Sequence, residues 1–292
     1  MLESIIEAVI HPFKEIGFML TQPILIMAII VGALVSLCAA LLGVILVLKR
    51  YSMIGIGLSN VGFAAMVIAA VLNIDSSMVI AIPLVIAVAF ILLNIRENSK
   101  IKGDSAVALV STISLAIGWV IVSQTTGMNS DVCNFLFGSI FTVVITDVYL
   151  SIGLSVIVLT LFILFYNKLF AVTFDETSAK TAGIKTNLYN SLVAFLTALT
   201  IVLGMRVMGS MLISALIIFP ALTAMRLFKK FKSVTICAAI VSVFSFFIGM
   251  YVSWDYEIGG GASVVLVNTI TFVIFWLIAI FVNSGLINKS RK

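Results

Sequence analysis

FDETSAKTAG, Phe174–Gly183, is a polar and charged segment between two long apolar runs, Ser151–Phe170 and Leu188–Leu203. If the flanking runs lie in a bilayer, a hydrophilic segment of this size must lie outside it. Thr173 or Asp175 can cap a helix here, because their side-chain oxygens accept from free backbone N–H groups. The segment therefore predicts one short helix in water beside a membrane domain.

The end of the segment also favours a helix. Gly183 can close it in a left-handed turn, which glycine adopts readily. A short helix at the edge of a membrane domain is well suited to docking a soluble partner. An ordinary solvated loop is the alternative.

The composition of the chain predicts an all-α, polytopic membrane protein. Of 292 residues, 62% are hydrophobic and 10% are charged, whereas soluble domains carry about 25% charged residues. The net charge of +5 does not indicate a nucleic-acid partner, because the basic residues sit in short loops, where they set topology. Cys38, Cys133 and Cys237 show no pairing spacing, so neither a disulfide framework nor a zinc cluster is indicated.

Eight to nine transmembrane helices and one short helix outside the bilayer, within about residues 173–187, are expected between residues 21 and 285. Residues 1–20 form an amphipathic segment, interrupted by Pro12, that is expected to lie at the membrane interface. A spanning helix needs about 20 apolar residues. The candidate runs are Ile24–Leu48, Met53–Leu72, Met78–Leu93, Ser105–Ser123, Val148–Tyr166, Leu188–Leu203, Val207–Met225, Val234–Tyr251 and Ala262–Val282.

Three features interrupt the apolar pattern. Val132–Ile145 is apolar but short, which favours a re-entrant or partly buried segment with Gly138 as its bend. Arg206 and Gly209 mark a break between two runs. Pro220 lies inside the second of these runs, where it frees a backbone carbonyl.

The basic residues predict an orientation. If nine segments span, one side carries Lys49, Arg50, Arg96–Lys102, Lys168–Lys185, Arg226–Lys232 and the basic tail at 286–292. The opposite loops carry Asp75, Asp131, Asp255 and Glu257, and Arg206 is their one basic residue. By the positive-inside rule, the N-terminus is outside and the C-terminus and Phe174–Gly183 are cytoplasmic.

The sequence lacks the motifs of an ATPase or a metalloenzyme. GxxxxGK[ST], HExxH and CxxC are absent, and the single histidine, His11, lies outside the expected spans. No span carries a charge near its middle, which argues against a proton pump built on buried carboxylates and against a strong metal site in the membrane core.

Neutral polar residues remain as candidates for a weakly polar translocation path. They are Ser59, Asn60, Ser210 and Ser214. The alternative is interhelical hydrogen bonding, worth about 0.6 kcal/mol per bond. Met205, Met208 and Met211 lie near the same break and are interpreted as packing residues rather than ligands of a soft metal.

Four stretches together resemble the permease subunit of bacterial ABC importers for zinc, manganese or iron. They are Gly43–Ala65, Phe135–Ile140, Phe174–Ile184 and Arg206–Arg226. Their order and spacing suit that family over nearly the whole chain. The third resembles the coupling helix that docks in a groove of the ATPase.

This resemblance implies a plasma-membrane permease without enzymatic activity or a bound cofactor of its own. It implies a homodimer with a pathway between the protomers, two cytoplasmic ATPase subunits that bind and hydrolyse ATP, and an extracellular metal-binding lipoprotein. The docking residues that it implies are Phe174, Asp175, Glu176, Ala179 and Gly183.

The chain departs from the family in the second expected helix. The family typically reads Gly-Asp-x-x-Ser-His-Ala, and here Ile56 takes the acidic position and Asn60 the histidine position. Asn60 is thus only a weak candidate metal ligand. Either the metal passes without strong ligands, or the substrate has changed, or the subunit pairs with a different half. An ATPase-independent secondary transporter or channel is the remaining alternative.

Overall fold

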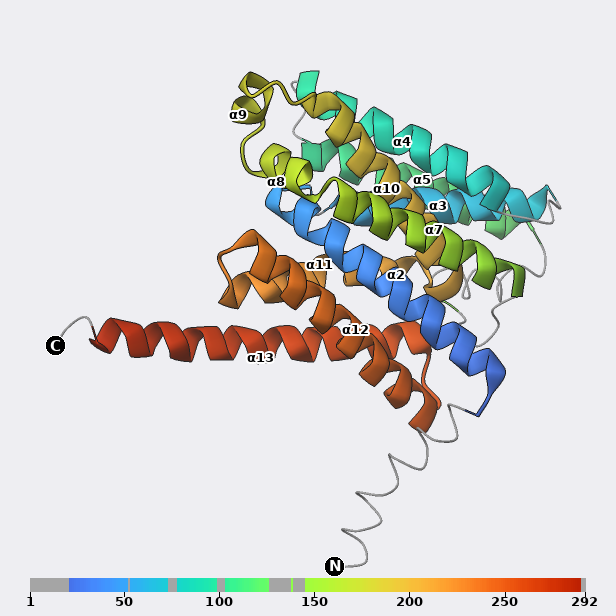
Figure 1. Ribbon diagram of the computed structural model, residues 1–292. Helices are drawn as coiled ribbons and strands as arrows, with labels where there is room; N and C mark the ends of the chain where they lie inside the picture. The colour runs from blue at the N-terminus through green and yellow to red at the C-terminus, as the bar shows by residue number, and fades with distance from the viewer. Residues whose placement is uncertain are drawn as a thin grey trace, which may run out of the picture.

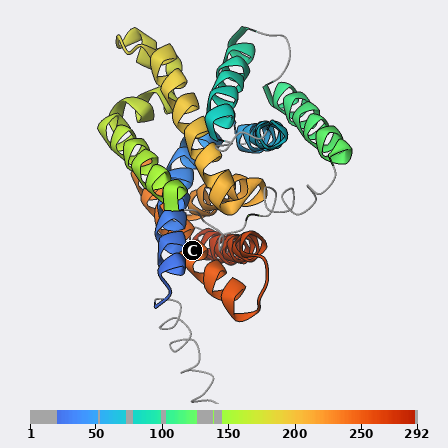
Figure 2. The ribbon, with the colours of Figure 1, turned by 90° about the vertical axis from the view of Figure 1, so that its right-hand side faces the viewer.

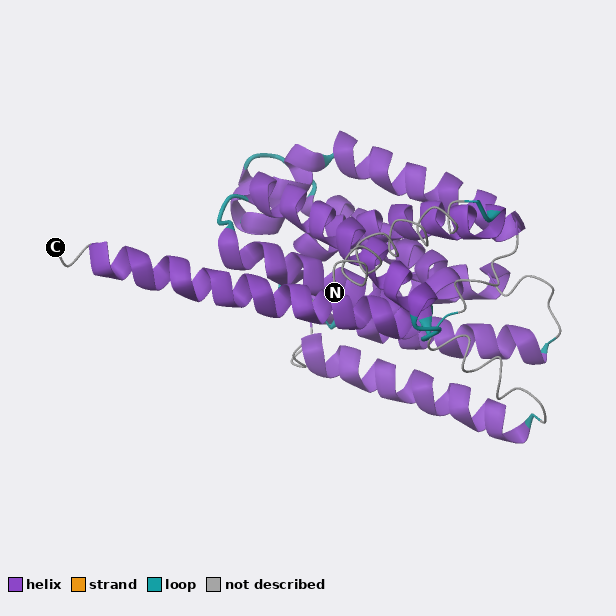
Figure 3. Ribbon diagram, turned by 90° about the horizontal axis from the view of Figure 1, so that it is seen from below, coloured by secondary structure: helices purple, strands orange, loops and turns teal. Residues whose placement is uncertain are grey.

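The computed structural model describes residues 21–51, 53–72, 78–98, 103–125, 138 and 145–289, and these contain helices and loops but no strand (Figure 3). The helices are α2 (Pro23–Leu48), α3 (Ile54–Val71), α4 (Met78–Asn98), α5 (Gly103–Gln124), α7 (Ile145–Leu164), α8 (Tyr166–Phe174), α9 (Glu176–Thr181), α10 (Thr186–Met208), α11 (Ser210–Leu227), α12 (Phe231–Asp255) and α13 (Gly260–Lys289). The expected interfacial segment at 1–20 lies outside the described residues.

The helices confirm the prediction of an all-α, polytopic membrane protein. Among the described residues, seven helices are long and apolar enough to cross a membrane. The pair α7 and α8, bent by 69°, gives an eighth if it forms one broken span. Helix α4 adds a shorter apolar stretch, Ile80–Leu92, which contains Pro83.

Helix α2 lies at the centre of the bundle and packs against α7, α10, α11 and α12 (Figure 1). Two of its glycines allow this close packing. A Cβ on Gly32 would lie 2.0 Å from the ring of Phe246 on α12. A Cβ on Gly43 would lie 2.0 Å from the carbonyl oxygen of Ile217 on α11. The backbones of α2 and α11 are therefore in direct contact.

The predicted break between α10 and α11 is confirmed at Gly209 but not at Arg206, because α10 continues to Met208 and contains Arg206. Gly209 separates the two helices with φ +87°. Gly138 also has a positive φ, +76°, and a Cβ there would lie 2.2 Å from the carbonyl oxygen of Met208. The predicted bend at Gly138 thus packs its backbone against this break. The rest of the expected re-entrant segment lies outside the described residues, apart from Ile145, which begins α7.

Helices α5 and α13 lie at the edges of the bundle. Figure 2 shows α5 beside α3, and Figure 1 shows α13 extending beyond the other helices toward the C-terminus. Both expose large apolar side chains, such as Leu109 and Leu266, as expected of surfaces that face lipid or another subunit. Helix α13 continues to Lys289, beyond residue 286, where a basic tail was expected to begin.

Candidate functional site

The four neutral polar residues selected from the sequence line one pocket of about 470 Å³. Helix α3 supplies Ser59 and Asn60, and helix α11 supplies Ser210 and Ser214. Apolar side chains of α5, α11 and α13 complete the wall. The structure therefore brings together residues that are about 150 positions apart in the sequence, as the contact between Ser59 and Ser214 illustrates (separation 155).

Two serine hydroxyls connect α3 and α11 at this pocket. Ser59 Oγ lies 2.9 Å from Ser214 Oγ, and either atom can be the donor. Ser59 Oγ is also 2.9 Å from the carbonyl oxygen of Ile56, and Ser214 Oγ is 2.8 Å from that of Ser210. Because each hydroxyl has one proton to donate, only two of these three contacts are hydrogen bonds at any moment. The pair can thus exchange a donor without moving a helix.

Asn60 is held by a residue that was not singled out from the sequence. Its Nδ2 donates to Ser111 Oγ on α5 at 2.6 Å. The amide nitrogen is thereby engaged, and the carbonyl oxygen is the atom with which Asn60 can meet a cation. The only sequence signal for Ser111 is that it is polar within an apolar run.

The pocket has a neutral lining. Ile56, at the position where the family resemblance expects an acidic residue, is 37% exposed and lines it together with Asn60. Met211 is 52% exposed and adds a thioether to the wall. No group of three or more His, Cys, Asp or Glu residues in the described part of the chain could hold a metal ion. The arrangement offers hydroxyl, amide and thioether groups but no strong ligand set.

The polar segment at 174–183 forms the short helix α9, as predicted, and Asp175 caps it. Asp175 Oδ1 accepts from the backbone N–H groups of Thr177 at 3.0 Å and Ser178 at 3.1 Å. Its Oδ2 accepts from Ser178 Oγ at 2.5 Å. These bonds, chiefly those from Ser178, lower the pKa of Asp175. Thr173 is not the cap, because its hydroxyl donates to the carbonyl of Leu169 within α8.

Gly183 closes the helix in the predicted left-handed turn, with φ +81°. The N–H of Ile184 donates to the carbonyl of Ala179 at 3.0 Å, and that of Gly183 donates to the carbonyl of Lys180 at 3.1 Å. This is the Schellman arrangement, in which both bonds satisfy carbonyls at the end of a helix.

The five expected docking residues do not face the same way. Phe174 is 58% exposed, and Asp175 and Gly183 are exposed as well. Ala179 is only 3% exposed and packs into the core, while Glu176 is half-buried. The first three are accessible to a partner, and the last two attach α9 to the rest of the protein.

An aromatic cluster joins α8 to α12 beside this segment. The rings of Phe170 and Phe174 lie 5.1 Å and 6.2 Å from the ring of Phe231, measured between centroids. Phe231 is the first residue of α12 and is buried. Phe174 therefore connects α8 with α12 through ring contacts.

Comparisons with known proteins agree on one class. The chain is 28% identical to the manganese import system permease protein ScaB of Streptococcus gordonii, over 90% of this chain and 92% of the relative. It is 30% identical to the high-affinity zinc uptake system membrane protein ZnuB of Haemophilus influenzae, over 86% and 96%.

A solved structure and a family model support the same assignment. The structure of PsaBC from Streptococcus pneumoniae in complex with Fab has a TM-score of 0.80 and 27% identity, covering 90% of this chain and 94% of that one. The model of the ABC 3 transport family matches residues 21–279, which is most of the sequence. The chain therefore belongs to the ABC 3 transport family, as a membrane permease subunit.

Proposed function

We propose that this chain forms the membrane pathway of an ATP-driven importer for a divalent metal ion, and that the ion passes through the pocket between α3 and α11. The observation that carries the proposal is the pairing of Ser59 and Ser214 in a pocket that Asn60 and Ser210 also line. A cluster of neutral oxygens in an apolar bundle suits a substrate that must cross without being trapped.

The relatives support a metal ion as substrate, since those compared above are named for manganese and zinc. A relative named as a probable iron transport membrane protein is 29% identical. The positions at which the resemblance expects an acidic residue and a histidine, Ile56 and Asn60, both line the pocket. The lining of the pocket thus includes both positions, although neither carries the residue type that is typical of the family.

The neutral lining determines how an ion would cross. Hydroxyl and amide oxygens can replace part of the hydration shell of a hard cation. Without a carboxylate or an imidazole, they do not compensate for removing all of its water. We infer that the ion passes partly hydrated and binds weakly here, with Asn60 Oδ1 as its strongest ligand in this chain.

The proposed partner at α9 is a cytoplasmic ATPase subunit, which would bind and hydrolyse the ATP. Phe174, Asp175 and Gly183 are exposed and lie at the ends of α9, which is capped by Asp175 and closed by the turn at Gly183. A preformed helix loses less conformational freedom on binding than a mobile loop would. This chain itself would do no covalent chemistry and would hold no cofactor.

The proposed assembly is a homodimer in the plasma membrane with an extracellular metal-binding lipoprotein above it. The proposed orientation has the N-terminus outside and the C-terminus in the cytoplasm. Its support is that two basic residues from separate loops, Lys49 and Lys180, meet through Asn190 and Glu176 at one end of the bundle. Lys49, after α2, donates to Asn190, which in turn contacts Glu176 of α9.

Uptake into proteoliposomes tests the proposal. The vesicles would contain this chain, its ATPase and its binding protein, and Mn²⁺, Zn²⁺ and Fe²⁺ would be offered separately. We expect ATP-dependent uptake of at least one ion, lost when the binding protein is omitted. ATP hydrolysis that responds to the binding protein without uptake of any ion would overturn the metal assignment. Uptake without the ATPase would favour a secondary transporter.

Co-purification with the ATPase tests the docking surface. The doubly substituted variant Asp175→Arg and Gly183→Trp should insert in the membrane normally but lose its ATPase. Both positions are exposed, so the substitutions leave the transmembrane packing untouched. A double variant that still co-purifies with the ATPase would show that docking occurs elsewhere.

A further inference from the structure

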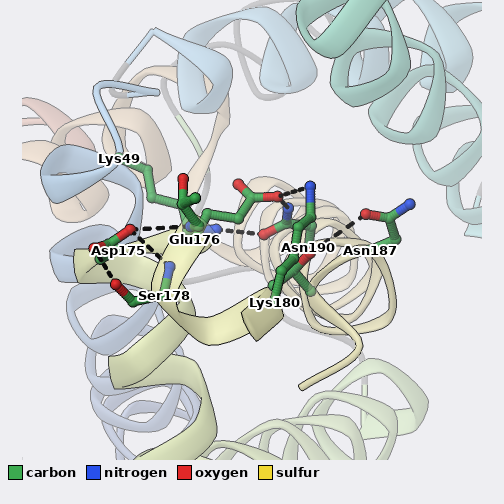
Figure 4. A network of polar contacts seen from close by, with 9 residues as sticks. Lys49, Asp175, Glu176, Ser178, Lys180, Asn187 and Asn190 are labelled. Atoms are coloured by element: carbon green, nitrogen blue, oxygen red, sulfur yellow. Dashed lines mark hydrogen bonds and ion pairs between the residues drawn. The ribbon is translucent and has the colours of Figure 1, made fainter. Parts of the chain in front are cut away.

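A polar network connects the docking helix α9 to the ends of two long helices (Figure 4). Asn190, on α10, donates through Nδ2 to Glu176 Oε1 at 3.4 Å, and its Oδ1 accepts from Lys49 Nζ. Glu176 also forms an ion pair with Lys180 at 3.3 Å. Lys49 directly follows α2 and is its C-terminal cap residue. Three elements, α2, α9 and α10, thus meet through side chains outside the apolar bundle.

Charge and partial burial both act on this network. Lys49, Glu176 and Asn190 are all half-buried. Partial burial acts to raise the pKa of Glu176. Hydrogen bonds from Lys180 and Asn190, together with the positive charges of Lys49 and Lys180, outweigh this effect and lower the pKa. A positive charge at the C-terminal end of α2 also complements the dipole of that helix.

Helix α2 leads from Lys49 to the pocket. Gly43 lies six residues before Lys49 and brings the backbone of α2 against the carbonyl of Ile217 on α11. Ile217 lies three residues after Ser214. Its side chain also packs against α3, because a Cβ on Gly55 would lie 3.4 Å from Ile217 Cδ1. With no side chain between the two backbones, a shift of α2 must displace α11.

We propose that Lys49 is a positioning residue that passes movement of the docking helix α9 through α2 to the pocket between α3 and α11. The inference rests on the proposed function, because it needs an ATPase that acts on α9. Lys49 touches neither the partner nor the substrate in this scheme. It acts by holding Asn190, and through it Glu176, to the end of α2.

The link through Lys49 is separable from attachment of the ATPase. The exposed docking residues Phe174 and Asp175 are held by the aromatic ring of Phe231 and by the cap bonds of α9, neither of which involves Lys49. Removing the Lys49 ammonium should therefore leave the docking surface formed. What is lost is the polar link from Glu176 of α9 through Asn190 to the end of α2, while the packing of α8 against α2 remains.

The test measures the pocket directly and needs no knowledge of the substrate. In a chain carrying Met211→Cys, with the natural cysteines replaced, the reaction rate of the pocket thiol with a water-soluble methanethiosulfonate reagent is measured with and without ATP and vanadate. With Lys49 present, ATP should change the rate. Lys49→Met should reduce that ATP effect about fivefold or more while the ATPase still co-purifies.

Four further variants sharpen the result. Lys49→Arg keeps the charge and the donor and should restore the ATP effect. Asn190→Leu should act like Lys49→Met, and the two together should cost no more than either alone. Lys168→Met is the matched control, because it removes an exposed cation that lies over the ring of Tyr189 rather than in this network.

The outcomes separate the inference from the proposed function. An unsubstituted chain that does not co-purify with the ATPase overturns the proposed function. A chain that co-purifies but whose pocket thiol reacts at the same rate with and without ATP overturns both the inference and the proposed pathway through the pocket. A Lys49→Met variant with an undiminished ATP effect overturns the inference alone. So does loss of the ATPase from Lys49→Met, which would mean that Lys49 only supports the docking surface.

Discussion

Replacing Gly43 by alanine should force α2 and α11 apart. The new Cβ would lie 2.0 Å from the carbonyl oxygen of Ile217, whereas ordinary van der Waals contact begins at 3.4 Å. The helices must therefore separate by about 1.4 Å, the difference between these distances, since a backbone carbonyl cannot rotate away as a side chain can. The change acts at the helix pair that we propose to connect the docking helix with the pocket.

The expected cost follows from overpacking. Extra methyl groups in a packed core cost about 1–3 kcal/mol, and the better helix propensity of alanine returns up to about 1 kcal/mol. Because the clash is with a backbone atom, the upper end of this cost applies, so we expect a net loss of about 2 kcal/mol and a fall of about 4–8 °C in the apparent melting temperature. Thermal unfolding of the purified chain in detergent measures it.

Gly153→Ala is the control for this prediction. Gly153 lies on α7, is exposed, and has nothing within 4 Å of the position of a Cβ. This substitution should leave the melting temperature unchanged or raise it slightly, because only helix propensity changes. Equal melting temperatures for Gly43→Ala and the unsubstituted chain would refute the close contact between α2 and α11.

Three further predictions concern the pocket and the docking helix. The double substitution Ile56→Asp and Asn60→His should create Mn²⁺ or Zn²⁺ binding that calorimetry can measure. It should also slow maximal uptake, because a carboxylate and an imidazole hold the ion more tightly. Unchanged binding would contradict the placement of both residues in the pocket. Gly183→Ala should cost about 1–2 kcal/mol at its positive φ, seen as faster hydrogen exchange in α9. Because the pKa of Glu176 is lowered, its stabilisation of α9 should be full above the ordinary carboxyl range and be lost in acid, as the pH falls through the lowered pKa. Hydrogen exchange should report that loss. Because the pKa of the capping Asp175 is lowered as well, Glu176→Gln should reduce the pH dependence, and Glu176→Gln together with Asp175→Asn should remove it.

Features that depend on local chemistry could be predicted from the sequence. The cap at Asp175, the turn at Gly183 and the break at Gly209 each follow from what one residue type does to its own backbone. Apolar runs of sufficient length gave the helices in the same way. Two runs differed from the helices. The run ending at Tyr166 is not one helix, because α7 ends at Leu164 and the chain bends by 69° before α8. The run expected from Val207 begins too early, because α10 continues to Met208 and α11 starts at Ser210. Hydropathy predicts which residues lie in a membrane, but it does not predict where a helix changes direction.

Contacts between helices could not be predicted. The sequence marked Ser59 and Ser214 as polar, but nothing in it placed one against the other, or Ser111 against Asn60. The burial of Ala179 could not be predicted either, because a helix of six residues has too few positions for a pattern that defines a buried face. These properties depend on how the helices pack.

Blocking the pocket tests the central claim most directly. Met211→Cys, in a chain without its natural cysteines, places a thiol in the pocket, whereas Leu266→Cys places one on the exposed face of α13 outside it. If the pocket is the pathway, a charged methanethiosulfonate reagent should abolish ATP-dependent uptake in the first variant only, and the transported ion should slow the reaction. Uptake that continues at the full rate after complete modification of Met211→Cys would contradict the account.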